Sequence, residues 1–492
     1  MKKYFLSIAA VVSLGITSCK KEFLDTFPTT SVAAADALAS TQNAIAALNG
    51  IHRVMYTQYD AQGQAGEGSV NIFRDLMGED IVYPLANGSA GLITWMQWIN
   101  HRNVNASDMR FVYRFYYRLI ANANILINGI DGVAGLDADK KMIKGQALAY
   151  RGWAYFQLVQ LYGERYAAGA TNTQLGVPLL LTNTLEGQPR ATVEEVYTQV
   201  NKDIDEAIVL LGGYNRTGSA AKSNFNVNVA HGIKARIALA QQRWEVAATN
   251  AVEARKGFPL MTNTEYLSGF NNITNQEWIW GSRQIDDHNT FFWSYFAYIS
   301  ANFNSTVIRT QPRAVNANLY NAIPSTDIRK QVFDLTGASV PVPPGGARVP
   351  YQNKKFLAQS SSASMGDVPY MRSAEMYLIE AEARARLGQF DVAQNALFTL
   401  VSNRDAAYLK STNTGESLIE EIMLNRRIEL WGEGFRFTDL KRTNAPMTRA
   451  GIPNHLTALI QVTTIPAGDK MWQFLFPQDE INANPAIVQN PL

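Results

Sequence analysis

Apolar and polar residues follow a helical period over most of the chain. Between residues 140 and 162, the apolar or small positions fall on one stripe of a helix surface, as the core-facing side of a globular helix requires. Similar stripes recur farther along. The segments that we expect to be helical are 33–59, 109–130, 140–162, a helix beginning after Thr192, 227–241 and 370–387.

Local signals mark where helices start and where the chain is irregular. Thr192 and Glu195 have the spacing of a capping box, in which each side chain bonds a free amide at a helix start. Segments with loop-like composition separate the helical ones. We expect loops at 62–68, 84–108 and 341–350, and mostly irregular structure after residue 443.

One short pattern occurs twice. Residues 243–247 (RWEVA) recur as residues 389–393 (QFDVA), and each copy follows one Ala-rich helical segment and precedes another. The aromatic residue would lock the turn, and the small Ala would let the two helices approach. Such a helix–turn–helix resembles a tetratricopeptide unit. The copies are far apart, which favours hairpins fused into a larger body; two unrelated hairpins are the alternative.

The N-terminus has the features of an export signal. A short basic start precedes an apolar run, residues 4–16, which is too short to span a bilayer as a helix. Two small residues then lead into Cys19, the only cysteine of the chain. This order is typical of a bacterial lipoprotein signal, so we expect residues 1–18 to be removed and Cys19 to carry acyl chains. The alternative is a secreted chain with an incidental cysteine.

Charge and hydropathy exclude two classes of function. The 492 residues include 44 Lys and Arg and 42 Asp and Glu, and removal of the signal takes away Lys2 and Lys3, so that the two signs balance. A nucleic-acid partner would need clustered positive charge. No later segment has eighteen consecutive apolar residues, so we expect a chain that is anchored to a membrane rather than threaded through it.

Several segments together resemble one protein family. They are YRGWAYFQLVQLYG (150–163), GVPL (176–179) with PRATVEEVY (189–197), DVPYMRSAEMYLIEAEA (367–383), RIELWGEGFRFTDLKR (427–442), and FPQDEINANP (476–485) with QNP (489–491). Their order and spacing, together with the lipoprotein signal, are similar to those of the SusD/RagB family of Bacteroidetes. The resemblance covers nearly the whole chain after Cys19.

The resemblance implies a fold, a location and a partner. It implies a mainly α fold in which tetratricopeptide-like helical hairpins pack against a loop-rich, irregular ligand-binding region, as a single domain of residues 19–492. It implies a lipoprotein on the outer surface of the outer membrane, seated over a SusC-like TonB-dependent β-barrel transporter. Family members capture oligosaccharides, and some capture peptides, for import. The family pattern leads us to expect an acidic residue at position 425, which would form a local salt bridge. This chain has Asn425 there and departs from the pattern.

Fold motifs do not locate a ligand, so the binding face must be sought in the variable stretches. Two such stretches, near 83–108 and 278–303, combine aromatic side chains with amide, acidic and basic ones, and the second has nine aromatic residues in 26. Flat rings would cover the C–H faces of a sugar, and the polar groups would bond its hydroxyls; a peptide would also suit such a surface. The residues that we expect to contact ligand are Trp95, Trp98, Asn100, His101, Arg283, Trp293 and Tyr295.

Part of this aromatic content is expected to be core. Trp278 and Trp280 alternate with their neighbours as in a strand, and both are expected to be buried. Trp95 and Trp98, in contrast, lie in a polar stretch before a helix, and we expect them to present an exposed stacking surface.

No arrangement of residues points to catalysis. The five histidines are scattered without metal-binding spacing, and no G-x-S-x-G motif occurs. The adjacent carboxylates Glu79–Asp80 and Asp286–Asp287 do not supply the separation of about 5–9 Å that a glycosidase needs. Asp203 and Asp205 are expected on a solvated helix face. We therefore expect a binding protein without metal or cofactor; a surface glycosidase and a pure assembly scaffold are the alternatives.

Overall fold

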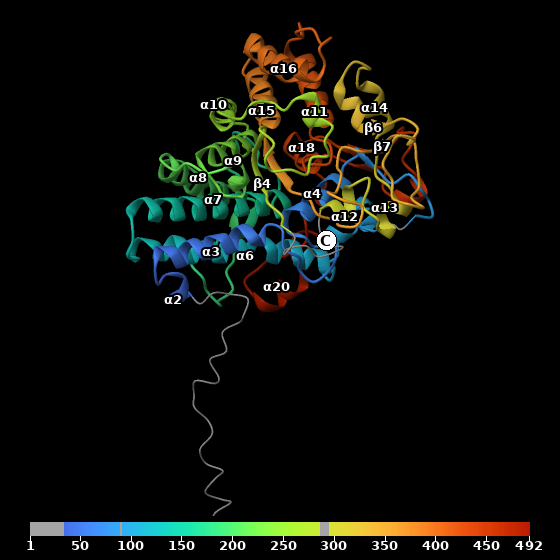
Figure 1. The fold of residues 1–492 in the computed structure, drawn as a ribbon. Helices are drawn as coiled ribbons and strands as arrows, with labels where there is room; N and C mark the ends of the chain where they lie inside the picture. Colours follow the sequence, from blue (N-terminus) through green and yellow to red (C-terminus); the bar gives the residue numbers. More distant parts are fainter. Residues whose placement is uncertain (1–33, 89–90, 286–294) are drawn as a thin grey trace, which may run out of the picture.

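A computed structural model describes residues 34–88, 91–285 and 295–492 (Figure 1). The signal segment 1–18 and Cys19 lie outside the described residues, as do Asp286, Asp287 and Trp293. Within the described parts, the expected mainly α fold is confirmed: long helices alternate with short strands and irregular connections.

A stack of antiparallel helices forms one side of the molecule. Each helix packs on its neighbour in the order α3, α6, α7, α8, α9, α10, α15, with α16 and α17 against α15, and Figure 1 shows them rising from α3 and α6 to α16. Their bounds are α3 (Thr41–Val54), α6 (Ser107–Gly129), α7 (Asp137–Tyr162), α8 (Val193–Leu211), α9 (Val227–Ala240), α10 (Trp244–Arg255), α15 (Ser373–Arg386), α16 (Phe390–Arg404) and α17 (Gly415–Glu429).

The repeated pattern forms two hairpins, as predicted. Helices α9 and α10 pack together, as do α15 and α16, and the small residues Ala247 and Ala393 are fully buried where the helices meet. The second turn uses Gly388 at φ 74°, in the left-handed region that glycine enters without steric cost. The first turn places Gln242 in the same region, at φ 60°.

The start of α8 has the predicted capping box. The Thr192 hydroxyl accepts the amide of Glu195 at 3.2 Å, and the Glu195 carboxylate accepts the amide of Thr192 at 2.7 Å. Two donors that no helical carbonyl can reach are thereby satisfied, which sets the first residue of the helix.

Short elements and loops form the rest of the molecule. The strands pair in small antiparallel sheets: β1 (Ile81–Val82), β5 (Ala314–Val315), β7 (Gln352–Asn353) and β6 (Phe333–Asp334) in that order, β4 (Trp278–Ser282) with β8 (Val368–Arg372), β2 (Leu175–Pro178) with β3 (Arg190–Thr192), and β9 (Met447–Thr448) with β10 (Thr464–Ile465). The remaining α-helices are α2 (Ala34–Ala37), α4 (Gly66–Leu76), α5 (Ile93–Met96), α11 (Asn263–Tyr266), α12 (Phe296–Ile299), α13 (Thr306–Thr310), α14 (Ala317–Ala322), α18 (Arg436–Arg442), α19 (Thr457–Ile460) and α20 (Gln478–Ala483).

Three local predictions were wrong. The segment 84–108 is not entirely a loop, because it contains α5 and a 3₁₀ helix, Asn100–Arg102. The segment 62–68 is not entirely a loop, because α4 begins at Gly66, where φ is 55° and a Cβ would lie 2.0 Å from the carbonyl oxygen of Met55. Asp203 is not solvated: it is buried between α7 and α8, where Arg151 donates to its two oxygens at 2.8 and 2.7 Å. Asp205 is largely exposed and pairs with Lys234.

The described part of the chain contains no helix with both the length and the apolar character that a membrane span requires. The longest helix, α7, carries Asp137, Asp139 and three lysines in its first two turns.

A buried ion network joins the helical stack to the irregular region. Arg372, at the end of β8, donates to Glu277 beside β4, to Glu429 at the end of α17 (3.0 Å) and to Glu433 (2.7 Å). Arg404 of α16 donates to the first two of these carboxylates at 2.7 and 3.2 Å, and Lys355 donates to the third at 2.7 Å.

All of these charges are buried, so each depends on its partners. Burial alone would raise the pKa of the Glu433 carboxyl, but the charges of Arg372 and Lys355 outweigh burial and hold it below its usual value. The pKa of Glu429 is lowered in the same way by Arg404, Arg372 and Arg329.

Arg372→Met should therefore destabilise the fold by about 3–5 kcal/mol, because it leaves three buried carboxylates short of a cation. Urea unfolding monitored by circular dichroism measures this loss. The matched control is Arg384→Ala, which breaks the 2.7 Å pair with the exposed Glu245 and should cost less than about 1 kcal/mol. Equal losses in the two variants would contradict a structural role for the network.

Candidate functional site

The loop around Trp95 and Trp98 is packed inside the protein. The exposed fractions of the two residues are 0% and 1%. Trp95 stacks on Phe73 of α4 at 4.3 Å and donates its Nε1–H to Asp108 at 2.9 Å. Trp98 donates to the carbonyl oxygen of Met77 at 3.0 Å. The prediction that these two rings present an exposed stacking surface is therefore wrong.

The polar residues of the same loop divide into buried and accessible ones. His101 is fully buried, its Nε2 lies 2.8 Å from the carbonyl oxygen of Met471, and burial lowers its pKa to about 3. Asn100 is partly exposed and donates to Asp108 at 2.9 Å. The structure thus uses His101 in packing, whereas contact of Asn100 with a ligand stays a prediction.

The residues of the second predicted stretch, 278–303, also divide into buried and exposed ones. Tyr295 is 2% exposed, its ring lies edge-on to Phe356, and its hydroxyl donates to the carbonyl oxygen of Gly432. It is a core residue, which contradicts its expected exposure. Arg283 is exposed, so its contact with a ligand also stays a prediction. Trp278 and Trp280 lie buried in β4, as expected.

Trp98→Ala should lower the free energy of unfolding by about 3–5 kcal/mol, because it opens a large cavity in a packed core. A thermal melt and a urea titration measure the change. Leu136→Ala, at an exposed position, is the control and should change stability by no more than about 0.5 kcal/mol. A Trp98→Ala variant that melts at the wild-type temperature would contradict the core role of Trp98 and make it a candidate ligand contact again.

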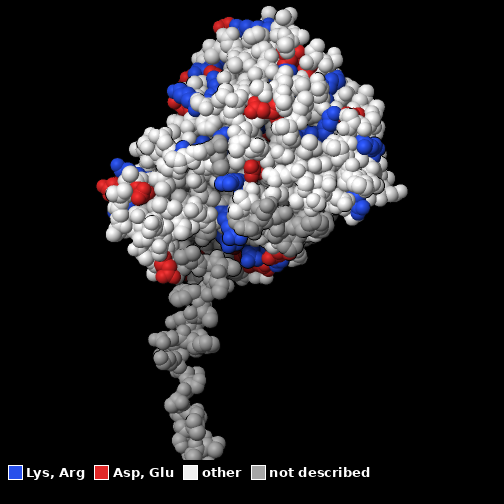
Figure 2. Space-filling view, viewed as in Figure 1, with Lys and Arg blue, Asp and Glu red and all other residues white. Residues whose placement is uncertain are grey.

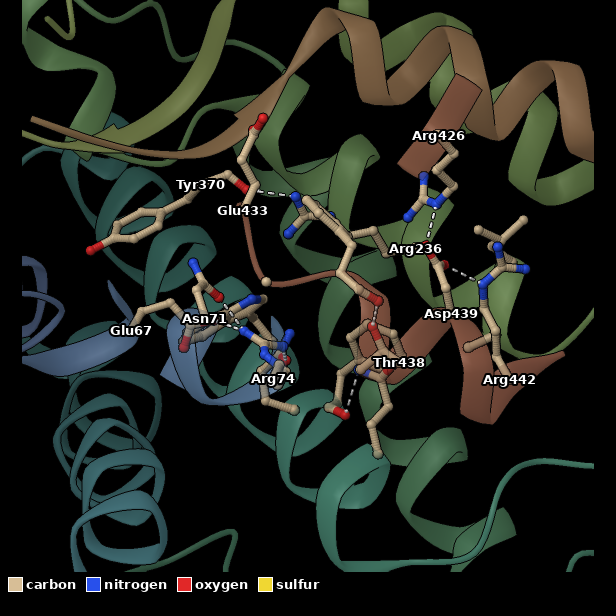
Figure 3. Close-up of a pocket in the computed structure, with 18 of the residues that line it drawn as sticks. Glu67, Asn71, Arg74, Arg236, Tyr370, Arg426, Glu433, Thr438, Asp439 and Arg442 are labelled. Carbon is tan, nitrogen blue, oxygen red and sulfur yellow. Dashed lines mark hydrogen bonds and ion pairs between the residues drawn. The ribbon is translucent and has the colours of Figure 1, made fainter. Parts of the chain in front are cut away.

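A charged cavity lies between α4, α7, α9 and the segment 433–442 (Figure 3). At one end, Arg74 donates to Glu67, to Asn71 and, at 2.6 Å, to Gln157. At the other end, three charged side chains are paired: Asp439 accepts from Arg426 at 2.7 Å and from Arg442 at 2.8 Å.

This cavity suits water rather than a sugar. Its volume is about 50 Å³, which holds a few water molecules, whereas sites for organic ligands measure about 300–1,000 Å³. Nearby, the buried Asp75 accepts the amides of Gly434 at 2.7 Å and Arg436 at 3.2 Å, and burial raises its pKa to about 7. The cavity is a polar junction between α4 and the segment 433–442.

The adjacent carboxylates Glu79 and Asp80 are also held in structural contacts, whereas Asp286 and Asp287 lie outside the described residues. Glu79 and Asp80 are buried: Arg436 donates to Glu79, and Arg427 donates to Asp80 at 2.6 Å. Burial would raise the pKa of Asp80, but Arg427 and Arg436 outweigh burial and lower it. Among residues 34–88, 91–285 and 295–492, no three His, Cys, Asp or Glu side chains are placed to hold a metal ion.

A larger opening lies on the outside of the molecule, which we call the α6–α20 groove. Its volume is about 690 Å³. It is lined by residues 58–60, by one side of α6, by residues 178, 180 and 184–188, and by α20 with the residue that follows it. Tyrosine, arginine and carboxylate side chains line it. They are Tyr59, Asp60, Tyr113, Arg114, Tyr117, Arg118, Glu186 and Glu480.

Sequence reasoning missed this groove. Its residues come from segments that are far apart in the sequence and meet only through packing, such as Asp60, Arg114 and Glu186. The sequence did hold one signal, the run of aromatic and basic residues from Arg110 to Arg118 within a helical segment.

The chain matches two sequence families. A family described as "SusD family" matches residues 270–492, and one described as "Starch-binding associating with outer membrane" matches residues 34–239. Among curated proteins, the chain is 25% identical over 393 residues to a SusD-like protein P38 of Formosa agariphila, which covers 70% of this chain and 74% of that protein.

Solved structures share the fold over nearly the whole chain. A SusD-like carbohydrate binding protein from Bacteroides vulgatus is 28% identical, with a TM-score of 0.79 over 91% of this chain and 97% of that one. The surface glycan-binding protein A from Bacteroides fluxus is 19% identical, with a TM-score of 0.72 over 92% of this chain and 99% of that one.

Proposed function

The chain belongs to the SusD family, and from that membership we propose that it captures oligosaccharides at the cell surface and delivers them to a SusC-like TonB-dependent transporter. It does so as a lipoprotein of the outer membrane, anchored through Cys19, and it binds its ligand without transforming it. Residues 19–492 act as one domain.

The observation that carries this proposal is the match to the SusD-like carbohydrate binding protein from Bacteroides vulgatus, at 28% identity over 91% of the chain. The described residues support a binding role over a hydrolytic one. The adjacent carboxylates Glu79 and Asp80 face guanidinium groups, so neither is a free acid beside a second carboxylate across an open site.

The mature chain without residues 1–19 should bind one or more oligosaccharides on a glycan array. The dissociation constant should lie between about 10⁻⁶ and 10⁻³ M, since a few stacking contacts and hydrogen bonds must also offset the cost of association. Isothermal titration calorimetry measures it. No released reducing sugar should follow incubation. Binding of peptides with no glycan binding would favour the peptide-capture function, and release of reducing sugar would favour an enzyme.

The anchor and the partner can be tested in one expression experiment. The wild-type chain should incorporate a palmitate analogue, stay in the membrane fraction and co-purify with a large β-barrel protein from outer membranes in mild detergent. Cys19→Ala should lose the label, because the acyl acceptor is that thiol. Cys19→Ser tests whether a hydroxyl can replace the thiol and should also lose the label. Label in either variant would refute acylation at Cys19. Recovery of the wild-type chain without a β-barrel protein would argue against association with a transporter.

A further inference from the structure

We propose that the α6–α20 groove is the glycan-binding site and that it takes an elongated, uncharged oligosaccharide. This inference rests on the proposed function and adds to it a place on the molecule and a class of ligand. The groove has the size that organic ligands require, at about 690 Å³.

The lining of the groove offers aromatic faces. Tyr117 donates its hydroxyl to the carbonyl oxygen of Pro178 at 2.7 Å, which holds the side chain in place. The ring of Tyr113 lies 4.5 Å from that of Tyr117, at 41° to it. Tyr117 and Tyr59 are partly exposed, whereas Tyr113 is buried and packs behind Tyr117. The guanidinium of Arg118 lies over the Tyr59 ring at 5.8 Å, so the part of the aromatic surface that a sugar C–H face can reach is centred on Tyr117.

Beside these rings lie polar groups that are free to bond hydroxyls. Asp60 and Arg114 are exposed at 61% and 60% of their side-chain surface. The Asp60 carboxylate lies 4.0 Å from Arg110 and 3.8 Å from Arg114, which is beyond hydrogen-bonding distance of either guanidinium. Its oxygens can therefore accept from sugar hydroxyls, while Arg114 can donate to them.

The charge of the groove favours a neutral ligand. Two guanidinium groups, Arg114 and Arg118, line it together with three carboxylates, Asp60, Glu186 and Glu480. The hollow that adjoins the groove at Gln58 and Arg118 adds Arg53, so that three guanidinium groups balance three carboxylates over both openings. A uronate or sulfated chain therefore meets no net attraction, whereas the hydroxyls of a neutral sugar can bond groups of either sign. Figure 2 shows the same mixture of signs over the visible face of the molecule, where basic and acidic side chains lie close together.

A second hollow of about 360 Å³ adjoins the groove, since Gln58 and Arg118 line both. The second hollow lies between α3 and α6, and Ala46, Ala47 and Gly50 form part of its wall. Small side chains keep this side open. The combined length suits a chain of several sugars rather than a monosaccharide.

The rim of the groove is held before any ligand arrives. Asn484, which follows α20, donates to the carbonyl oxygen of Gln188 at 2.9 Å and to Glu480 of α20 at 3.1 Å. At Gly187, a Cβ would lie 2.3 Å from the side-chain oxygen of Asn484, so the loop and α20 are in close contact. A rim fixed in this way reduces the ordering cost of binding.

The first test replaces two exposed groups of the groove. Asp60→Ala with Arg114→Ala should weaken binding of the neutral array oligosaccharide by tenfold or more, measured by titration calorimetry. The matched control is Asp391→Ala with Lys410→Ala, an exposed ion pair between α16 and the loop that follows it, and it should leave the affinity unchanged. Both pairs lie at the surface, so equal melting temperatures are expected for the two double variants.

The second test concerns length and charge. Gly50→Trp should remove the gain in affinity of a hexasaccharide over a disaccharide of the same series, because a Cβ at Gly50 meets open space and a bulky ring would fill the second hollow. The wild-type chain should bind a neutral oligosaccharide more tightly than its uronate or sulfated counterpart.

The outcomes separate the site from the function. Glycan binding by the wild-type chain that is unaffected by the Asp60 and Arg114 substitutions would overturn the groove as the site and leave the proposed function standing. A wild-type chain that binds no glycan would overturn both. Preference for the uronate or sulfated chain, or an unchanged length dependence in Gly50→Trp, would overturn the class of ligand proposed for the groove.

Discussion

The buried charge network around Arg372 is the interaction on which the rest of the structure depends. Three carboxylates, Glu277, Glu429 and Glu433, share the interior with Arg372, Arg404 and Lys355, and at most 5% of any of these side chains is exposed. An unpaired charge in such a place would cost several kcal/mol. The partners come from the residue before β4, from β8, from the helices α16 and α17, and from the segments after α17 and after β7. All of these elements must therefore meet in one arrangement for every charge to be paired.

The same physical constraint explains the motifs that resemble the SusD/RagB pattern. The motif at 367–383 supplies Arg372, and Glu382 within it accepts from Arg442 at 2.8 and 2.7 Å. The motif at 427–442 supplies Glu429 and Glu433, which accept from Arg372. It also supplies Lys441, whose ammonium donates to three backbone carbonyl oxygens. Burial lowers the pKa of Lys441 to about 7. These motifs therefore specify how the helical stack joins the irregular region, and they say nothing of a ligand.

The departure at Asn425 fits this network. Its side-chain oxygen accepts from Arg329 at 2.8 Å, and Arg329 also donates to Asp327 at 2.6 Å. Glu429 lies 3.6 Å from the same guanidinium. Since two carboxylates already balance Arg329, the amide of Asn425 supplies a further acceptor without a further charge. A hydrogen bond from the Arg329 cation to an uncharged amide oxygen thus stands where a salt bridge was expected.

The sequence by itself determined the helices, the repeated hairpins, the cap at Thr192 and the burial of Trp278 and Trp280, because these follow from spacing along the chain and from local chemistry. It did not determine which aromatic residues face solvent. Trp95 and Trp98 lie in a polar stretch, but Phe73 and Trp472, from distant segments, cover them. The α6–α20 groove likewise exists only where residues 58–60, α6, the loop 180–188 and α20 come together. Exposure is a property of the assembled surface, so only the tertiary structure could decide which side chains a ligand can reach.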